Sequence, residues 1–246
     1  MLALDDITVA FDGFTVLDEL SFRLDQGELR FLIGPNGAGK TTLLDLLTGK
    51  VRPLTGKVMY DGNVDVSRHS EHSLVKLGIG RKFQTPAIYR SLTCWEHLEV
   101  AIGFRRGILG LFGSLSRDER ERMRDALDAV GLTQRAGIRA GALSHGEQQW
   151  LEIAMLLVQD PKLLLLDEPV AGMTGHERQK TGELLHALEG KHTIIVTEHD
   201  MDFVRRFSRR VTVLHLGKVI KEGSIEEVQN DATVAEVYLG RSGRGA

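Results

Sequence analysis

The sequence predicts an α/β fold in which a buried parallel sheet is combined with an antiparallel β layer and a helical part. The first observation is the loop at residues 34–41, which has the form G-x-x-x-x-G-K-[ST] and stands between an apolar strand pattern and a helical apolar pattern. The second is the alternation of helical segments with wholly apolar strands after residue 143, which is typical of a parallel sheet covered on both faces. The third is a set of short alternating strands before residue 34, which indicates the antiparallel layer.

The loop at residues 34–41 is expected to wrap its backbone around phosphate groups. Its glycines permit positive φ and close backbone approach, and the following helix presents free N–H donors and a positive dipole end. We expect Lys40 to contact the β- and γ-phosphates, Thr41 to ligate Mg²⁺ and Thr42 to reach phosphate. A glycine-rich turn that matches the motif by chance is disfavoured, because the strand before the motif and the helix after it both lie where the motif requires them. The motif predicts binding of ATP or GTP through Gly34, Pro35, Asn36, Gly37, Ala38, Gly39, Lys40, Thr41 and Thr42.

Length and composition limit the class of protein. A chain of 246 residues with 42% apolar and 26% charged residues suits one large domain, or a domain with a subdomain. The net charge of −3 offers no electrostatic footprint for nucleic acid, which counts against an ATPase of DNA repair. The chain shows no basic leader and no apolar run near the ~18 residues that span a bilayer, and Cys94 alone cannot form an internal disulfide. We therefore expect a cytoplasmic protein that meets the membrane through partners.

Residues 87–142 change character towards helix. Two capping boxes each precede a helical apolar pattern there. The run 107–113 between them is rich in glycine and apolar residues, and it is either a loop or a surface that docks on a partner. The two boxes are Thr93 with Glu96 and Ser116 with Glu119.

From residue 143 onward the pattern alternates between helix and strand. We expect helices at residues 147–158 and 177–188 and buried strands at 163–166 and 193–197. A hairpin over residues 211–221 and a terminal helix, which starts at the capping box of Ser224 and Glu227, complete the expected order.

Acidic and imidazole side chains follow the two buried strands. Asp167 and Glu168 come directly after the strand at 163–166, and His199 follows the strand at 193–197. Open α/β sheets bind ligands at the carboxyl ends of their strands. We expect Asp167 to hold Mg²⁺ through water and Glu168 to act as general base on the attacking water, with His199 bonding the γ-phosphate and holding both in line. Solvated acids and a structural histidine are the alternative, which the nearby phosphate loop disfavours.

Residues 143–149 read Leu-Ser-His-Gly-Glu-Gln-Gln and precede one of the expected helices. Ser144 and Glu147 form a capping box, so a well-capped helix is one interpretation. The same free N–H groups, the Ser144 hydroxyl and the helix dipole can hold a phosphate instead. Gly146 would let that phosphate approach closely.

Five elements occur in the order GPNGAGKTT, Gln84, LSHGE, LLLLDE and His199. Together they resemble the ATP-binding subunit of an ABC transporter over essentially the whole chain. The resemblance implies a P-loop NTPase fold of the ABC type, as one ATPase domain over residues 1–246, with ATP and Mg²⁺ as cofactors. Within it, residues 1–86 and 159–246 would form the ATPase core lobe with the β layer, and residues 87–158 the helical subdomain.

The same resemblance implies roles for single residues. Two subunits of this family sandwich two ATP molecules head to tail, which implies that Ser144 and Gly146 contact the γ-phosphate bound by the opposite subunit. Gln84 is implied to touch Mg²⁺ and the attacking water and to sense the membrane partner. Phe11 matches the aromatic residue that stacks on adenine, although a strand core residue is the alternative for it.

Three positions depart from the pattern of the family. His145 stands for the usual glycine and Glu147 for the usual glutamine, both within the predicted nucleotide-binding stretch. Thr174 stands where an aspartate is common, which leaves open how that loop couples the two nucleotide sites. Residues 143–162 and 171–174 resemble the branched-chain amino acid importers, and within them the urea-importer ATPase subunit most closely.

We therefore expect the ATP-hydrolysing subunit of an importer, for urea in the first place and for branched-chain amino acids as the alternative. A second alternative is a non-transport ABC ATPase of DNA repair or of the ribosome, which the lack of a coiled-coil insertion disfavours. A GTPase switch would leave LSHGE and His199 without a role. The expected partners are a second ATP-binding subunit, different or identical, two permease subunits and an extracytoplasmic solute-binding protein, but no nucleic acid. The expected place is the cytoplasmic face of the inner (plasma) membrane.

Overall fold

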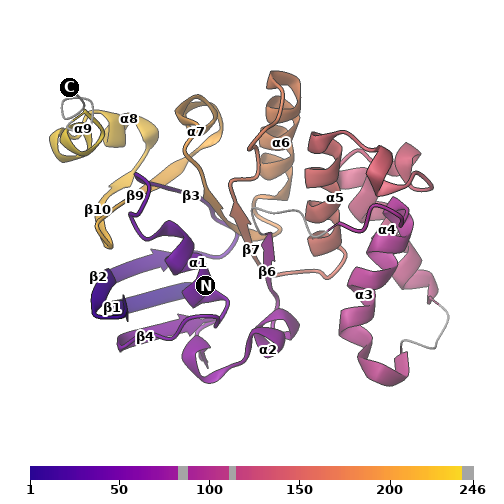
Figure 1. Cartoon of the computed structure of the whole chain (residues 1–246), viewed down its shortest axis with the longest axis horizontal. Coiled ribbons are helices and arrows are strands. Elements are labelled where there is room, and N and C mark those ends of the chain that lie inside the picture. The colour runs from indigo at the N-terminus through magenta and orange to yellow at the C-terminus, as the bar shows by residue number, and fades with distance from the viewer. Residues whose placement is uncertain (83–87, 111–114, 240–246) are drawn as a thin grey trace.

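Two sheets with helices packed around them make up the molecule (Figure 1). The computed structural model describes residues 1–82, 88–110 and 115–239, of which 104–110 and 238–239 are described by their backbone alone. One sheet is antiparallel, in the order β2-β1-β4-β5, with β1 Leu2–Phe11, β2 Phe14–Leu24, β4 Thr55–Tyr60 and β5 Val64–Asp65. The other has the order β10-β9-β3-β8-β7-β6, with β3 Leu29–Ile33, β6 Ile79–Lys82, β7 Leu163–Asp167, β8 Thr193–Thr197, β9 Arg210–His215 and β10 Lys218–Gly223. The predicted combination of sheets is confirmed.

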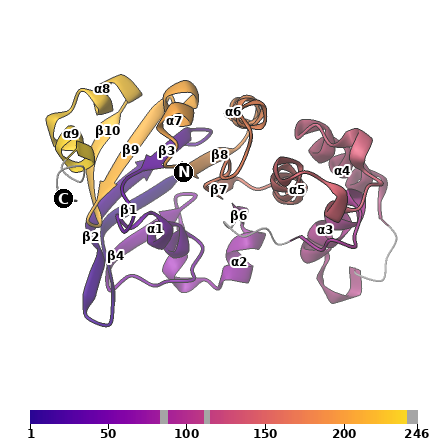
Figure 2. The same ribbon diagram turned by 45° about the horizontal axis from the view of Figure 1, so that its top comes forward.

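The helices that pack around these sheets are numbered in chain order. They are α1 Lys40–Leu47, α2 Glu71–Lys76, α3 Cys94–Gly110, α4 Arg117–Ala129, α5 His145–Leu157, α6 Gly175–Leu188, α7 Met201–Phe207, α8 Ile225–Gln229 and α9 Ala232–Leu239. Short 3-10 turns lie at Val66–Arg68, Thr133–Arg135 and Ala140–Ala142. Figures 1 and 2 both show α3 and α4 beyond α5, on the side away from the six-stranded sheet.

Strands β3, β7 and β8 of the six-stranded sheet are buried along their whole length, because both faces of the sheet are covered there. The central strands β9, β3, β8, β7 and β6 run parallel, and β10 pairs antiparallel at the edge. Successive side chains of a strand point to opposite faces. Leu163 and Leu165 accordingly join a core with α1 and the antiparallel layer, whereas Leu164 and Leu166 join a core with the helices.

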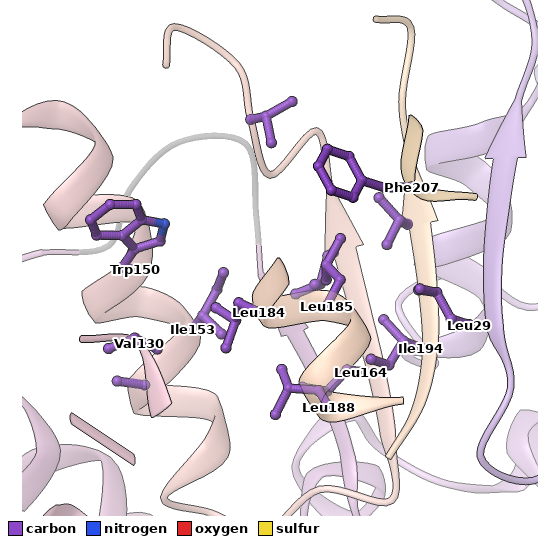
Figure 3. Packing of buried hydrophobic residues seen from close by; sticks show 14 of the residues in the cluster. Leu29, Val130, Trp150, Ile153, Leu164, Leu184, Leu185, Leu188, Ile194 and Phe207 are labelled. Atoms are coloured by element: carbon purple, nitrogen blue, oxygen red, sulfur yellow. The ribbon is translucent and has the colours of Figure 1, made fainter. Parts of the chain in front are cut away.

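The helical part shares one of these cores with the sheet. Figure 3 shows Leu184 of α6 next to Ile153 of α5, and Trp150 of α5 and Leu164 of β7 belong to the same buried cluster. The Trp150 indole Nε1 donates a hydrogen bond of 2.9 Å to Thr181 Oγ1 on α6, which satisfies the polar atom of a buried aromatic side chain. This hydrogen bond and the shared core fasten α5 to α6.

Reciprocal side-chain caps start most of the longer helices. The predicted boxes at Thr93, Ser116, Ser144 and Ser224 are confirmed, each with the serine or threonine and the glutamate three residues later exchanging hydrogen bonds. The structure adds one that the sequence analysis did not name, between Thr174 and Glu177 at the start of α6.

Two segments contain more helix than the sequence analysis expected. Residues 107–110 continue helix α3, so this part of the apolar run is helical, and residues 111–114 lie outside the described residues. The terminal segment forms two helices, because Asp231 accepts hydrogen bonds from the N–H groups of Thr233 and Val234 and starts a second helix.

A buried arginine joins the strands at one end of the parallel sheet. The Arg30 side chain is 1% exposed and donates to Glu28 Oε1 at 2.7 Å, to Thr212 Oγ1 at 2.6 Å and to Glu222 Oε1 at 2.5 Å. Its guanidinium also lies over the ring of Phe22, 5.4 Å from the centroid. Such a charge is compatible with the interior only because its partners are in place.

We expect Arg30→Ala to lower the free energy of unfolding by about 3–5 kcal/mol, since it leaves two carboxylates near a buried site without their cation. Urea titration followed by circular dichroism measures this quantity. The control is Arg23→Ala, which breaks an exposed ion pair with Asp5 of 2.8 Å and should cost about 1 kcal/mol or less. Equal losses in the two variants would contradict a structural role for the Arg30 network.

Candidate functional site

The predicted phosphate loop connects β3 to α1 and forms one wall of a cavity. The cavity has a volume of about 320 Å³ and is lined by Val16, Asn36, Gly37, Ala38, Gly39, Lys40, Thr41, Thr42, Asp167 and Glu168. Two glycines keep the loop close to its neighbours. A Cβ on Gly34 would lie 2.2 Å from the carbonyl oxygen of Leu214, and one on Gly39, whose φ is +104°, would lie 2.7 Å from Leu17 Cδ2. Seven of the nine predicted loop residues line this space, which is large enough for phosphate groups, whereas Gly34 and Pro35 do not line it.

Lys40 lies folded over its own loop. Its Nζ donates to the carbonyl oxygens of Gly34 at 2.6 Å and Pro35 at 3.2 Å. Burial lowers the pKa of the Lys40 ammonium, and the carboxylates of Glu168 and Asp167 act in the opposite direction. An anion in the cavity would stabilise the charged form of this lysine further, as expected of a phosphate-binding side chain.

Asp167 ends strand β7 and is held from two sides. Thr197, its register partner on β8, donates from Oγ1 to Asp167 Oδ1 at 2.6 Å. Arg81 on β6 lies between two carboxylates, bonded to Asp45 of α1 and with its Nη2 3.4 Å from Asp167 Oδ2. These contacts hold the Asp167 carboxylate in one orientation where it lines the phosphate cavity.

Glu168 and His199 meet at the edge of the sheet. Glu168 has a φ of +46°, and its N–H donates to the carbonyl oxygen of Thr197 at 3.1 Å, which fixes this turn at the strand end. Its Oε1 lies 3.2 Å from His199 Nδ1. Parallel neighbours β7 and β8 end at the same level, so residues 31 positions apart come together as predicted.

A buried glutamate beside His199 shapes this edge. Glu198 is 1% exposed, and its carboxylate accepts hydrogen bonds from the N–H groups of Val170 at 3.3 Å, His199 at 3.2 Å and Asp200 at 3.4 Å. Burial raises the pKa of the Glu198 carboxyl, while these hydrogen bonds act to lower it. Glu198 thus ties the loop after β7 to the loop after β8, and it keeps Glu168 and His199 in one place.

The donor set at this edge fits a nucleoside triphosphate with Mg²⁺. The Thr41 hydroxyl and the Asp167 carboxylate are hard oxygen ligands beside a loop built for phosphate. Mg²⁺ is usually held by one or two carboxylates together with substrate phosphates. Gln84, the remaining predicted contact of Mg²⁺ and water, lies outside the described residues.

The stretch from Ser144 to Glu147 forms the N-terminus of α5 and does not line the phosphate cavity. The Ser144 hydroxyl accepts the N–H of Glu147 at 3.1 Å, and Glu147 Oε2 accepts the N–H of Ser144 at 2.9 Å. His145 is exposed, with Nε2 3.1 Å from the carbonyl oxygen of Ala171. The replacement of glycine by His145 therefore links this helix end to the loop that follows Glu168.

Phe11 ends β1 on the outside of the molecule. It faces Phe14 across a two-residue turn whose residues, Asp12 and Gly13, have φ of +48° and +84°. Its side chain is 46% exposed, so the alternative of a strand core residue is wrong. The stacking of Phe11 on adenine stays a prediction.

Several residues that organise the site were missed from the sequence. Arg81, Thr197 and Glu198 belong to no recognisable sequence motif. Arg81 and Thr197 reach Asp167 because their parallel strands are in register, and Glu198 bonds the loop after β7 because it is buried. Thr174 and Glu177 did carry a signal, since they match the S/T-x-x-E pattern of a capping box.

Comparison with known proteins agrees with this geometry. A family model described as ABC transporter matches residues 17–171. The high-affinity branched-chain amino acid transport ATP-binding protein LivG of Salmonella typhimurium is 34% identical, over 98% of this chain and 98% of its own length. The corresponding protein BraF of Pseudomonas aeruginosa is 32% identical over the same shares of the two chains.

Solved structures show the same fold. The crystal structure of the ADP conformation of an ATP-binding cassette of an ABC transporter superposes with a TM-score of 0.86, at 30% identity and over 98% of both chains. In the part of the chain that the structure describes, no helix has the length and apolar character needed to cross a bilayer. By its phosphate loop, its paired carboxylates at the strand ends and its match over nearly the whole length, the chain belongs to the ABC transporter family, as one of its ATP-hydrolysing cassettes.

Proposed function

We propose that this cassette powers the import of branched-chain amino acids. The observation that carries its role as an ATPase is the meeting of Glu168 and His199, 3.2 Å apart, beside a phosphate cavity that Glu168 lines. Both curated relatives described above are named for high-affinity transport of these amino acids. They support this alternative over urea, which the sequence analysis had placed first. The substrate assignment depends on the relatives, because the site described above acts on the nucleotide.

The chemistry at the edge of the sheet is hydrolysis of the γ-phosphate. Glu168 accepts a proton from the attacking water as the water oxygen bonds to the γ-phosphorus and the bond to the bridging oxygen breaks. His199 holds the Glu168 carboxylate and the water in line. Lys40 neutralises charge on the phosphates, and Thr41 and Asp167 would hold Mg²⁺, which when bound neutralises developing negative charge.

The N-terminus of α5 completes the nucleotide site of a second subunit in this proposal. Ser144 and Gly146 do not line the phosphate cavity of their own subunit, so one subunit does not bring both groups to the same nucleotide. A head-to-tail pair does so, with α5 of one subunit placed over the phosphates bound by the other. Closure with ATP and reopening after hydrolysis then shift a two-state equilibrium of the pair.

The expected partners and cellular location of the cassette follow from this function. Two permease subunits and a solute-binding protein outside the cytoplasm would complete the importer, with the cassettes on the cytoplasmic face of the inner membrane. The second cassette is either a copy of this chain or a different one.

We expect Glu168→Gln to bind ATP normally and to hydrolyse it roughly 10²–10⁴-fold more slowly, since the amide cannot accept the proton. Single-turnover hydrolysis and equilibrium ATP binding by the purified protein measure the two quantities. Asp202→Asn, which alters an exposed carboxylate of α7, is the control. Rapid hydrolysis by Glu168→Gln free of contaminating ATPases would remove Glu168 as the base.

His199→Ala should lower kcat for ATP by roughly 100-fold and leave KM nearly unchanged, because it disturbs the alignment of Glu168 rather than the phosphate loop. Steady-state kinetics over a range of ATP concentrations separates the two parameters. His176→Ala changes an exposed histidine of α6 and serves as the matched variant. A rise in KM with unchanged kcat would instead assign His199 to ATP binding.

Deletion of this chain should abolish uptake of labelled leucine and leave uptake of labelled urea unchanged. Restoring the chain should recover leucine uptake, while restoring Glu168→Gln should not. Loss of urea uptake alone would return the assignment to urea. If neither solute is affected under inducing conditions, the transport role itself fails.

A further inference from the structure

A carboxylate of the same chain occupies the N-terminus of α5. Glu177, the third residue of α6, places its Oε1 3.1 Å from the Ser144 hydroxyl, which donates to it. Its Oε2 accepts the N–H and the hydroxyl of Thr174, each at 2.9 Å. The Ser144 hydrogen is therefore already used within the subunit.

Glu177 also fills the approach over Gly146. A Cβ on Gly146 would lie 2.3 Å from Glu177 Oε1, so this carboxylate rests directly against the glycine backbone. The first turn of a helix attracts anions through its free N–H groups and its dipole. Glu177 is thus an internal anion at the place where a phosphate would have to settle.

The charge of Glu177 is secured by its own hydrogen bonds. The N–H of Thr174, together with the hydroxyls of Thr174 and Ser144, holds the pKa of this carboxyl below its usual value. Two like charges at one helix end repel each other, so a γ-phosphate arriving there meets a fixed negative charge.

We propose that Glu177 competes with the γ-phosphate for the Ser144 hydroxyl and the Gly146 backbone, and so weakens closure of the cassette pair on ATP. This inference rests on the proposed role of α5 as the lid of the opposite nucleotide site. Glu177 is a residue that tunes ATP affinity rather than a catalytic residue. ADP lacks the group with which it competes.

Glutamine is the informative replacement because it preserves the structure. Gln serves at the third position of a capping box as Glu does, so Glu177→Gln keeps the start of α6. It removes the charge and replaces the oxygen that accepts from the Ser144 hydroxyl by an amide NH2 group. Glu227→Gln is the matched control, since Glu227 has the same position in the box of Ser224 at the start of α8. Equal melting temperatures of the two variants verify that the fold is retained.

The test uses the importer complex purified through a tag on this chain, with Glu168→Gln present to prevent hydrolysis. Equilibrium binding of labelled ATP and of labelled ADP is measured with and without Glu177→Gln. We expect Glu177→Gln to lower the Kd for ATP about 5- to 10-fold, and to leave the Kd for ADP within a factor of about 2, whereas Glu227→Gln changes neither.

The outcomes separate the two proposals. Unchanged ATP affinity in Glu177→Gln, or an equal gain for ATP and ADP, would overturn the competition and leave the proposed function intact. If the complex that carries Glu168→Gln alone binds no ATP, the proposed function is overturned, and the inference with it.

Discussion

The parallel register of β3, β8 and β7 is the constraint on which the site depends. These strands are hydrogen-bonded neighbours, and each ends in a segment that carries chemistry. Because parallel strands present their carboxyl ends at one edge, the phosphate loop, the Asp167–Glu168 pair and His199 converge without any direct sequence proximity. A shift by one residue would turn Glu168 from the edge towards the other face of the sheet.

Around that edge, charges are arranged so that each buried acid has a defined partner. Asp45, Arg81 and Asp167 form a chain from α1 to β7, and Thr197 completes the bonds of Asp167. Glu198 accepts three backbone N–H groups beside His199. Hydrogen bonds and ion pairs are strong in a low-dielectric interior, where an unpaired polar group is costly. These networks therefore hold the reactive side chains in place before a nucleotide binds.

The contact between α5 and α6 gives the helical part its connection to the catalytic core. Trp150 packs into the shared core and bonds Thr181, while Lys180 lies 4.1 Å above its ring. At the N-terminal end of the same contact, Glu177 of α6 bonds Ser144 of α5. One helix pair therefore carries both the packing that fastens the two parts and the charge that we propose to control ATP affinity.

The sequence by itself determined the phosphate loop, the strands β3, β7 and β8, four capping boxes, and the acids and histidine at the strand ends. These are local patterns, set by periodicity, by glycine conformations and by hydrogen bonds between residues three apart. Only the tertiary structure decided which acid is bonded by Arg81 and Thr197, how Glu198 joins two loops and that Glu177 lies on the N-terminus of α5. Those contacts join residues up to 86 positions apart, and no local pattern encodes them because they arise from strand register and helix packing.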